Sequence, residues 1–75
     1  KEGLITFKDI NFKDLMKELE KNFGIRIIID NHTLDNYACS GKFRISDGIE
    51  QVLRALQQDA HFTFERESGT EIRIQ

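Results

Sequence analysis

The side chains with the most reactive chemistry in this sequence are His32, Cys39 and His61. Imidazole and thiolate groups bind zinc, but a structural zinc site needs about four ligands, usually in closely spaced pairs. The chain has one cysteine, so it offers neither an internal disulfide nor a cysteine pair for a metal. A nucleophile made of Cys39 and His61 would need a third group to orient the imidazole, and the sequence shows no candidate. We therefore interpret Cys39 as a small core thiol and His61 as a partly exposed strand residue.

Other sequence signatures of enzymes do not point to a site either. The acidic residues are dispersed over predicted helix faces and turns, which does not favour the paired carboxylates of a glycosidase. No glycine-rich nucleotide-binding spacing occurs. The sequence thus predicts no catalytic residue, no metal ligand and no cofactor. A small enzyme or ligand-binding domain stays open as an alternative, and it would require a pocket with converging polar groups.

The composition is typical of one small globular domain spanning 1–75. With 75 residues, 39% hydrophobic and 32% charged, the chain can build one core and differs from disordered sequences. Its 11 basic and 13 acidic residues give a net charge of −2, so no nucleic-acid partner is predicted. No apolar run is long enough for a membrane helix, and no signal peptide is recognisable. Because the chain begins with Lys1, we expect a piece of a longer protein, so any targeting or anchoring segment would lie outside it.

The segment 12–23 carries the clearest secondary-structure signal. Its apolar residues recur with the spacing of one helix face, and they are Phe12, Leu15, Met16, Leu19 and Phe23. Gly24 follows, and we expect it to end the helix because glycine tolerates a left-handed backbone. Asp9 and Asn11 both have side-chain oxygens that can cap the first turn, and Asp9 is the preferred N-cap. The opposite helix face mixes acidic and basic side chains, Glu20 among them, and is interpreted as solvent-exposed.

The remaining elements are predicted from alternation, turn residues and a second helical pattern. Strands are predicted at 4–7, 25–29, 37–43, 61–66 and 71–75, with a hairpin turn at 67–70. A second helix is predicted within 44–58, capped by Ser46 and with Gly48 in its first turn. Its apolar residues are Ile49, Val52, Leu53 and Leu56.

An internal repeat relates the two halves of the chain. Laying the second helix on the first superposes Val52 on Leu15 and Leu53 on Met16. Neither helix can bury its apolar face alone, so each is expected to pack on the other and on a sheet. The predicted fold is α+β, a duplicated βαβ unit in the order β-α-β-β-α-β-β with two helices packed on small sheets.

This order of elements, with apolar residues at these positions, is similar to a known family. The residues that carry the similarity are Ile5 to Asp9, Phe12, Leu15, Met16, Leu19, Phe23 to Asn31 and Leu34 in the first half, and Ser40, Gly41, Phe43, Ile49, Glu50, Val52, Leu53, Leu56 and Phe62 to Ile74 in the second. They resemble STN, the periplasmic signalling domain of secretins and TonB-dependent receptors, and more closely the C-terminal domain of FecR-family anti-sigma regulators from Gram-negative bacteria. Asn11, Gly48 and Cys39 depart from the family's pattern.

The resemblance implies a periplasmic protein-interaction domain of a single-span inner-membrane regulator whose cytoplasmic end holds a sigma factor. It implies as partner the periplasmic signalling domain of an outer-membrane TonB-dependent transducer, which would trigger sigma release after binding its cargo. It implies no catalytic or metal-binding residue. The alternative is an STN-type domain at the N-terminus of a secretin or TonB-dependent receptor, which would stand first in its parent gene instead of last.

A candidate contact surface follows from one irregularity in the segment 25–29. Ile25, Ile27 and Ile29 share one face of the predicted strand, which leaves Ile28 on the other face. Leu34 and Tyr37 flank Ile28 on the following loop and strand. We predict that Ile28, Leu34 and Tyr37 form a small exposed apolar patch for protein contact. Local packing, with Leu34 covering the end of the sheet, stays open as the alternative.

Overall fold

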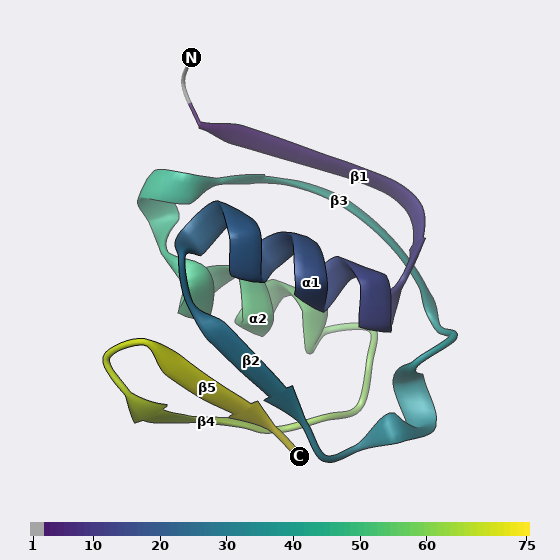
Figure 1. The fold of residues 1–75 in the computed structure, drawn as a ribbon. Coiled ribbons are helices and arrows are strands. Elements are labelled where there is room, and N and C mark those ends of the chain that lie inside the picture. The colour runs from purple at the N-terminus through teal and green to yellow at the C-terminus, as the bar shows by residue number, and fades with distance from the viewer. Residues whose placement is uncertain (1–2) are drawn as a thin grey trace.

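The chain has the predicted α+β fold in a computed structural model that describes residues 3–75 (Figure 1). The elements are β1 (Leu4–Asn11), α1 (Phe12–Phe23), β2 (Arg26–Ile29), β3 (Ala38–Arg44), α2 (Ile49–Leu56), β4 (Phe64–Ser68) and β5 (Glu71–Ile74). Two short 3-10 turns, η1 (His32–Leu34) and η2 (Ile45–Asp47), precede β3 and α2. The predicted order β-α-β-β-α-β-β is confirmed.

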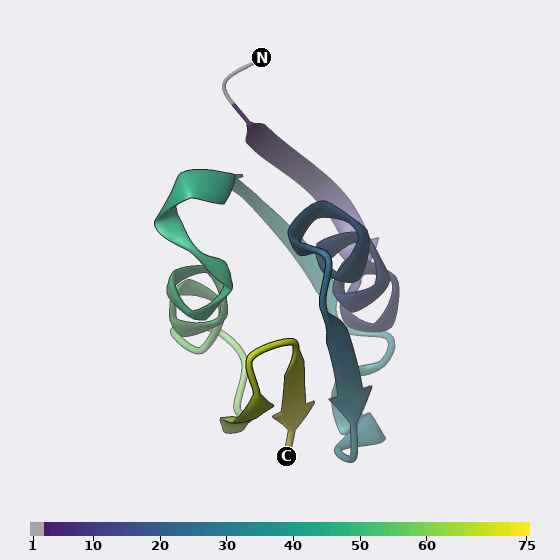
Figure 2. The ribbon, with the colours of Figure 1, turned by 60° about the vertical axis from the view of Figure 1, so that its left-hand side comes forward.

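The strands form two separate sheets. β1 and β3 pair antiparallel, and the second sheet has the order β2-β5-β4. Figures 1 and 2 show the β1–β3 ribbon above the helices and the second sheet below them. β5 pairs parallel with β2 and antiparallel with β4, the strands that end the two repeats. The final strand, which has no counterpart in the duplicated unit, therefore joins both repeats into one sheet.

The core is shared by both helices and both sheets. Its most deeply buried side chains are Phe12, Leu15, Met16, Leu19, Val52, Leu53, Ile72 and Ile74. The rings of Phe12 and Phe62 pack edge to face with centroids 5.3 Å apart, which links the start of α1 to the segment before β4. Because repeat-equivalent residues of both helices belong to one cluster, the prediction that the two apolar faces share a core is confirmed.

α1 covers the predicted apolar segment 12–23 and ends at the predicted Gly24, but its N-cap differs from the preferred one. Gly24 is left-handed, with φ 63° and ψ 41°, and its N–H donates to the carbonyl of Glu20. The N-cap residue is Asn11, whose side chain makes no capping hydrogen bond. Asp9, the predicted cap, is wrong because it lies inside β1, which runs four residues further than the predicted 4–7.

Asp9 belongs to a bulge in β1. The β1–β3 register shifts between Phe7 and Ile10, so that Lys8 and Asp9 together face Ser40. Asp9 has a positive φ of 51°, and its N–H donates to the hydroxyl of Ser40 at 3.0 Å. A bulge of this kind bends a strand and increases its twist. The bend carries β1 over the start of α1, as Figure 1 shows.

α2 is shorter than predicted and starts at Ile49. The residues before it form η2, and Gly48 is the N-cap with φ 90° and ψ 155°. This backbone conformation is accessible to glycine and is avoided by residues with a Cβ. The predictions of Ser46 as cap and of Gly48 inside the first turn are therefore wrong, because the chain leaves η2 through a conformation that Gly48 alone supplies.

The strands of the second sheet are close to their predicted positions. β2 and β5 match within about one residue, the usual uncertainty of element ends. β4 begins later than the predicted 61–66 and continues to Ser68. Phe62 is buried ahead of β4, and Thr63 exchanges two backbone hydrogen bonds with Gln75, at 3.0 and 2.7 Å. These bonds extend the β4–β5 pairing beyond the strands themselves.

Candidate protein-interaction surface

Ile28 lies on the outer face of the second sheet. In the parallel β2–β5 register, Ile27 stands beside Ile72, and both are buried. Side chains alternate between faces along a strand, so the next pair, Ile28 and Arg73, points away from the core. Ile28 is half-buried there. Its predicted orientation is confirmed, and its role in protein binding stays a prediction.

Leu34 and Tyr37 occupy the connection between β2 and β3. The N–H of Tyr37 donates to the carbonyl of Leu34 at 2.9 Å. The Leu34 side chain is half-buried and packs against the core. Tyr37 is 39% exposed, and its hydroxyl donates to the carbonyl of Asp59 at 3.4 Å. Leu34 and Tyr37 are thus neighbours in one turn, whereas Ile28 lies on the outer sheet face, and partner binding by the three residues stays a prediction.

Cys39 and His61 line different hollows of the molecule. Cys39 is buried on β3, and its thiol donates weakly to the carbonyl of Tyr37 at 3.6 Å. Burial raises the pKa of the Cys39 thiol, which disfavours the reactive thiolate. His61 is exposed, and it precedes β4 instead of lying in it as predicted. It borders a hollow with Gln57 and Gln75, whereas Cys39 lines a different one. His61 is therefore not placed to act as a base for the Cys39 thiol.

His32 lies beside one acidic partner, Asp35. Its Nδ1 atom lies 3.1 Å from Oδ2 of Asp35, within the turn that η1 forms. Across residues 3–75, no group of three or more His, Cys, Asp and Glu side chains is placed to hold a metal ion. None of the helices in the same range is long and apolar enough to cross a membrane.

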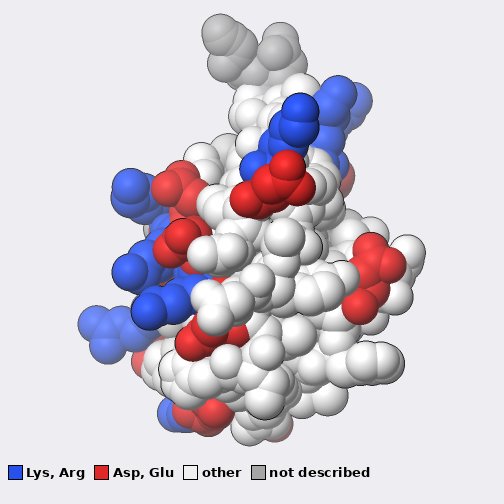
Figure 3. Space-filling model, turned by 90° about the vertical axis from the view of Figure 1, so that its right-hand side faces the viewer, with Lys and Arg blue, Asp and Glu red and all other residues white. Residues whose placement is uncertain are grey.

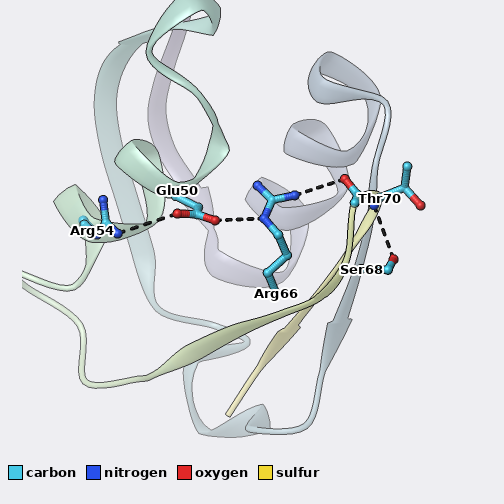
Figure 4. A network of polar contacts seen from close by, with 6 residues as sticks. Glu50, Arg54, Arg66, Ser68 and Thr70 are labelled. Atoms are coloured by element: carbon cyan, nitrogen blue, oxygen red, sulfur yellow. Dashed lines mark hydrogen bonds and ion pairs between the residues drawn. The ribbon is translucent and has the colours of Figure 1, made fainter.

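Glu50 and Arg66 join α2 to the β4–β5 hairpin (Figure 4). Arg66 Nε donates to Glu50 Oε2 at 2.8 Å, and Arg66 Nη1 donates to the carbonyl of Gly69 at 3.0 Å. Arg54 Nη2 lies 3.6 Å from the other Glu50 oxygen, one turn further along α2. The hydrogen bond from Arg66, more than the charge of either arginine, lowers the pKa of the Glu50 carboxyl. The sequence offered no sign of the link between Glu50 and Arg66, because the two residues belong to different elements.

Arg73 forms a second link on the outer sheet face. Its Nη1 donates to Asp30 Oδ2 at 2.9 Å, and its Nε donates to Glu67 Oε2 at 3.3 Å. The hydrogen bond to Asp30 is the main reason why the pKa of Arg73 is raised. Ile28 therefore stands beside Arg73, whose charge is already paired within the molecule. The apolar side chain of Ile28 is the distinctive feature of this face.

One side of the molecule is poor in charge. Figure 3 shows a broad surface without Lys, Arg, Asp or Glu at its centre, with both signs of charge around it. It is the side on which the bend of β1 and the connection between β2 and β3 lie in Figure 1. Depletion of charge at the centre of a surface patch is a compositional feature of protein interfaces.

These features define a small α+β domain with side-chain links between its elements, such as Glu50 to Arg66 and Arg73 to Asp30. The sequence model of the family described as FecR, C-terminal, matches residues 4–74. The chain therefore belongs to the FecR C-terminal family, as its resemblance predicted. The family is one of anti-sigma regulatory domains and is not a known enzyme family.

A solved structure has the same fold. The chain is similar to a protein assigned as an anti-sigma factor from Parabacteroides distasonis, with a TM-score of 0.83, 19% sequence identity and 99% of this chain covered. The chain spans about a third, 34%, of that protein's length. At this identity the likeness shows the fold alone. No curated protein matches the sequence.

Proposed function

We propose that the chain is the periplasmic protein-interaction domain of a FecR-like transmembrane anti-sigma regulator. The observation that supports this proposal is the family match across residues 4–74. FecR-family proteins are inner-membrane anti-sigma factors with a periplasmic C-terminal domain. In this role the domain receives the signalling domain of an outer-membrane TonB-dependent transducer, and this contact leads to release of the sigma factor in the cytoplasm.

The proposed contact surface combines Ile28 with the turn that contains Leu34 and Tyr37. Ile28 offers apolar area beside the paired charges of Arg73. Tyr37 combines exposed ring surface with a hydroxyl, the kind of side chain that is enriched in interfaces. The low charge on the side of the molecule shown in Figure 3 is consistent with protein docking.

The first experiment mixes the folded chain with the purified signalling domain of a TonB-dependent transducer from the same organism. We expect a complex by calorimetry, and we expect Ile28→Asp to weaken it because the carboxylate would be desolvated at the contact. Gln51→Asp is the matched control, because it adds the same charge at an exposed position of α2. Equal binding by both variants would exclude Ile28 from the contact, and no binding by the unmodified chain would contradict the proposed partner.

A second experiment addresses location. A reporter that is active only outside the cytoplasm, fused after the last residue of the parent protein, should be active. The flanking gene sequence should place this domain last, after one membrane span. A reporter active only in the cytoplasm, or a domain that stands first in the parent chain, would contradict the proposal and favour the STN-type alternative.

A further inference from the structure

β1 leaves one edge of its sheet without a neighbouring strand among residues 3–75. Ile45 donates its N–H to the carbonyl of Gly3 at 2.8 Å, so Gly3 and Ile45 form a hydrogen-bonded pair. Such pairs recur at every second residue of an antiparallel ladder, which places Ile5 in the next one. The backbone groups of Leu4 and Thr6 consequently point away from β3. Figure 1 shows β1 at the upper margin of the molecule, with no further element beyond this edge.

The other strand edges are each less suited to accept a strand. On β2, the outward N–H of Ile27 donates to the carboxylate of Glu20. The free edge of β3 borders a hollow that α2 lines with Leu56, and the Tyr37 hydroxyl bridges one end of this hollow to the chain after α2. β4 is short, rich in charge and tied to α2 through Arg66. Short, charged or covered edges resist the addition of a strand, so β1 is the edge best able to accept one.

An acidic hollow runs beside the free edge of β1. It has a volume of about 480 Å³ and is lined by the segment 5–11 together with Asp14 and Glu18 of α1. Its three carboxylates, Asp9, Asp14 and Glu18, outnumber its one cation, Lys8. Asp14 is exposed and forms no ion pair within residues 3–75, and Glu18 contacts Lys21 only at 4.0 Å. A strand added to β1 would turn every second side chain toward α1 and these two carboxylates. Charge complementarity therefore selects basic side chains at those positions.

The opposite face of the β1–β3 sheet favours apolar side chains on an added strand. Leu4 is 52% exposed there, beside Arg44 of β3, and Thr6 stands beside Lys42. The remaining side chains of an added strand would lie next to Leu4 and Thr6. Apolar groups there would cover the exposed leucine, whereas basic groups would be repelled by Lys42 and Arg44. The edge thus suits a strand in which basic and apolar side chains alternate.

We propose that the free edge of β1 binds an extended segment of a partner protein, with basic side chains alternating with apolar ones, as a third strand of the β1–β3 sheet. This inference rests on the proposed protein-binding function and adds a second surface to it, because Ile28 lies on the other sheet. Main-chain hydrogen bonds would supply affinity, and the alternating side chains would supply specificity. A second copy of this chain is a poorer occupant, because the acidic residues of the two α1 helices would repel each other at the interface.

The test uses a short synthetic peptide of alternating lysine and valine, with a glutamate and valine peptide of equal length as control. By NMR we expect the lysine peptide to shift the amide signals of Leu4 and Thr6 and to slow their exchange with solvent. Thr6→Pro removes the outward N–H and should weaken binding by about tenfold or more. Lys42→Pro is the matched control: Lys42 stands opposite Thr6, its N–H faces the other edge, and binding should stay within about twofold.

A charge reversal provides a test that does not depend on proline. Asp14→Lys combined with Glu18→Lys changes one exposed and one half-buried position of α1, and it should exchange the preference, so that the glutamate peptide binds better than the lysine peptide. Equal binding of both peptides by the unmodified chain, or full binding by Thr6→Pro, would overturn the proposal. Self-association that Thr6→Pro abolishes would also overturn it, by identifying a second copy as the occupant. Binding of the transducer domain without binding of the peptide would refute the β1 inference alone, whereas the reverse result would refute the proposed partner alone.

Discussion

The Glu20 carboxylate occupies the place that a neighbouring strand would take beside Ile27. Glu20 Oε2 accepts the hydrogen bond of the outward-pointing Ile27 N–H at 2.6 Å. Glu20 belongs to α1 and was interpreted from the sequence as part of a solvent-exposed face, yet it is half-buried against β2. The residue thus protects a sheet edge that would otherwise be open to pairing with another chain.

Glu20→Ala should destabilise the fold and expose the β2 edge. We expect a loss of about 1 kcal/mol in the free energy of unfolding, because water can partly replace the lost acceptor. Amide exchange at Ile27 should become faster, and Glu20→Gln should restore much of the protection because its carbonyl can accept the same bond. Glu18→Ala, two residues away and about half a turn round the same helix, is the control and should leave Ile27 unchanged. An unaltered exchange rate at Ile27 in Glu20→Ala would show that the carboxylate does not guard the edge.

Gly48→Ala should be more harmful than its small size suggests. A Cβ at Gly48 would meet no atom within 4 Å, so the cost comes from the backbone alone, which has a φ of 90°. Such a conformation costs about 1 to 3 kcal/mol for a residue other than glycine. Gly69 has equally open surroundings without a positive φ, and Gly69→Ala should change the free energy of unfolding by less than about 0.5 kcal/mol. Equal urea midpoints for the two variants would contradict this explanation.

Glu50 should give the fold a pH dependence on the acid side. Its pKa is lowered in the folded state, mainly by the hydrogen bond from Arg66. The stabilisation is therefore complete above the unfolded-state pKa of about 4.3, and it is lost as the pH falls through the lower folded-state pKa. An NMR titration of the Glu50 carboxyl checks the direction of the shift. Arg66→Met should raise this pKa further than Arg54→Met does, because Arg54 lies 3.6 Å away; a larger effect of Arg54→Met would contradict the assignment.

The sequence predicted α1 better than α2 for a local reason. The limits of α1 depend on a helical period followed by Gly24, and both signals act within one turn of the chain. At the start of α2, Ser46 has the side chain of a cap, but η2 takes up that residue. The sequence feature that could have located the start of α2 is Gly48, which stands directly before the apolar run and has a positive φ.

The arrangement of the sheets and the contacts of the site could not be predicted in the same way. The bulge at Asp9 places two residues opposite Ser40, which breaks the alternation that a strand prediction relies on. The position of β5 between β2 and β4 depends on pairing between distant segments. The outward orientation of Ile28 followed from local alternation, whereas the contact of Glu20 with Ile27 required the packing of α1 beside β2.

The shared core predicts that the two repeats unfold together. Met16 and Leu53 are equivalent in the repeat, are 1% and 0% exposed, and belong to one cluster. Truncation of either to alanine should cost about 2 to 5 kcal/mol, a large part of the stability of a domain of this size. Leu4→Ala, at a 52% exposed position, should change stability by less than about 0.5 kcal/mol.

The measurement is urea unfolding followed by far-ultraviolet circular dichroism and by the fluorescence of Tyr37. Coincident transitions are expected for each variant, because loss of either helix exposes the apolar face of the other. If alanine prevents folding, the milder variants Met16→Leu and Leu53→Val keep the question answerable, with costs of roughly 0.5 to 1.5 kcal/mol. β5 pairs with both β2 and β4, so it cannot remain in place when one of them unfolds. Two separate transitions in Leu53→Val, with α1 remaining helical after α2 has unfolded, would therefore mean that β5 does not couple the repeats.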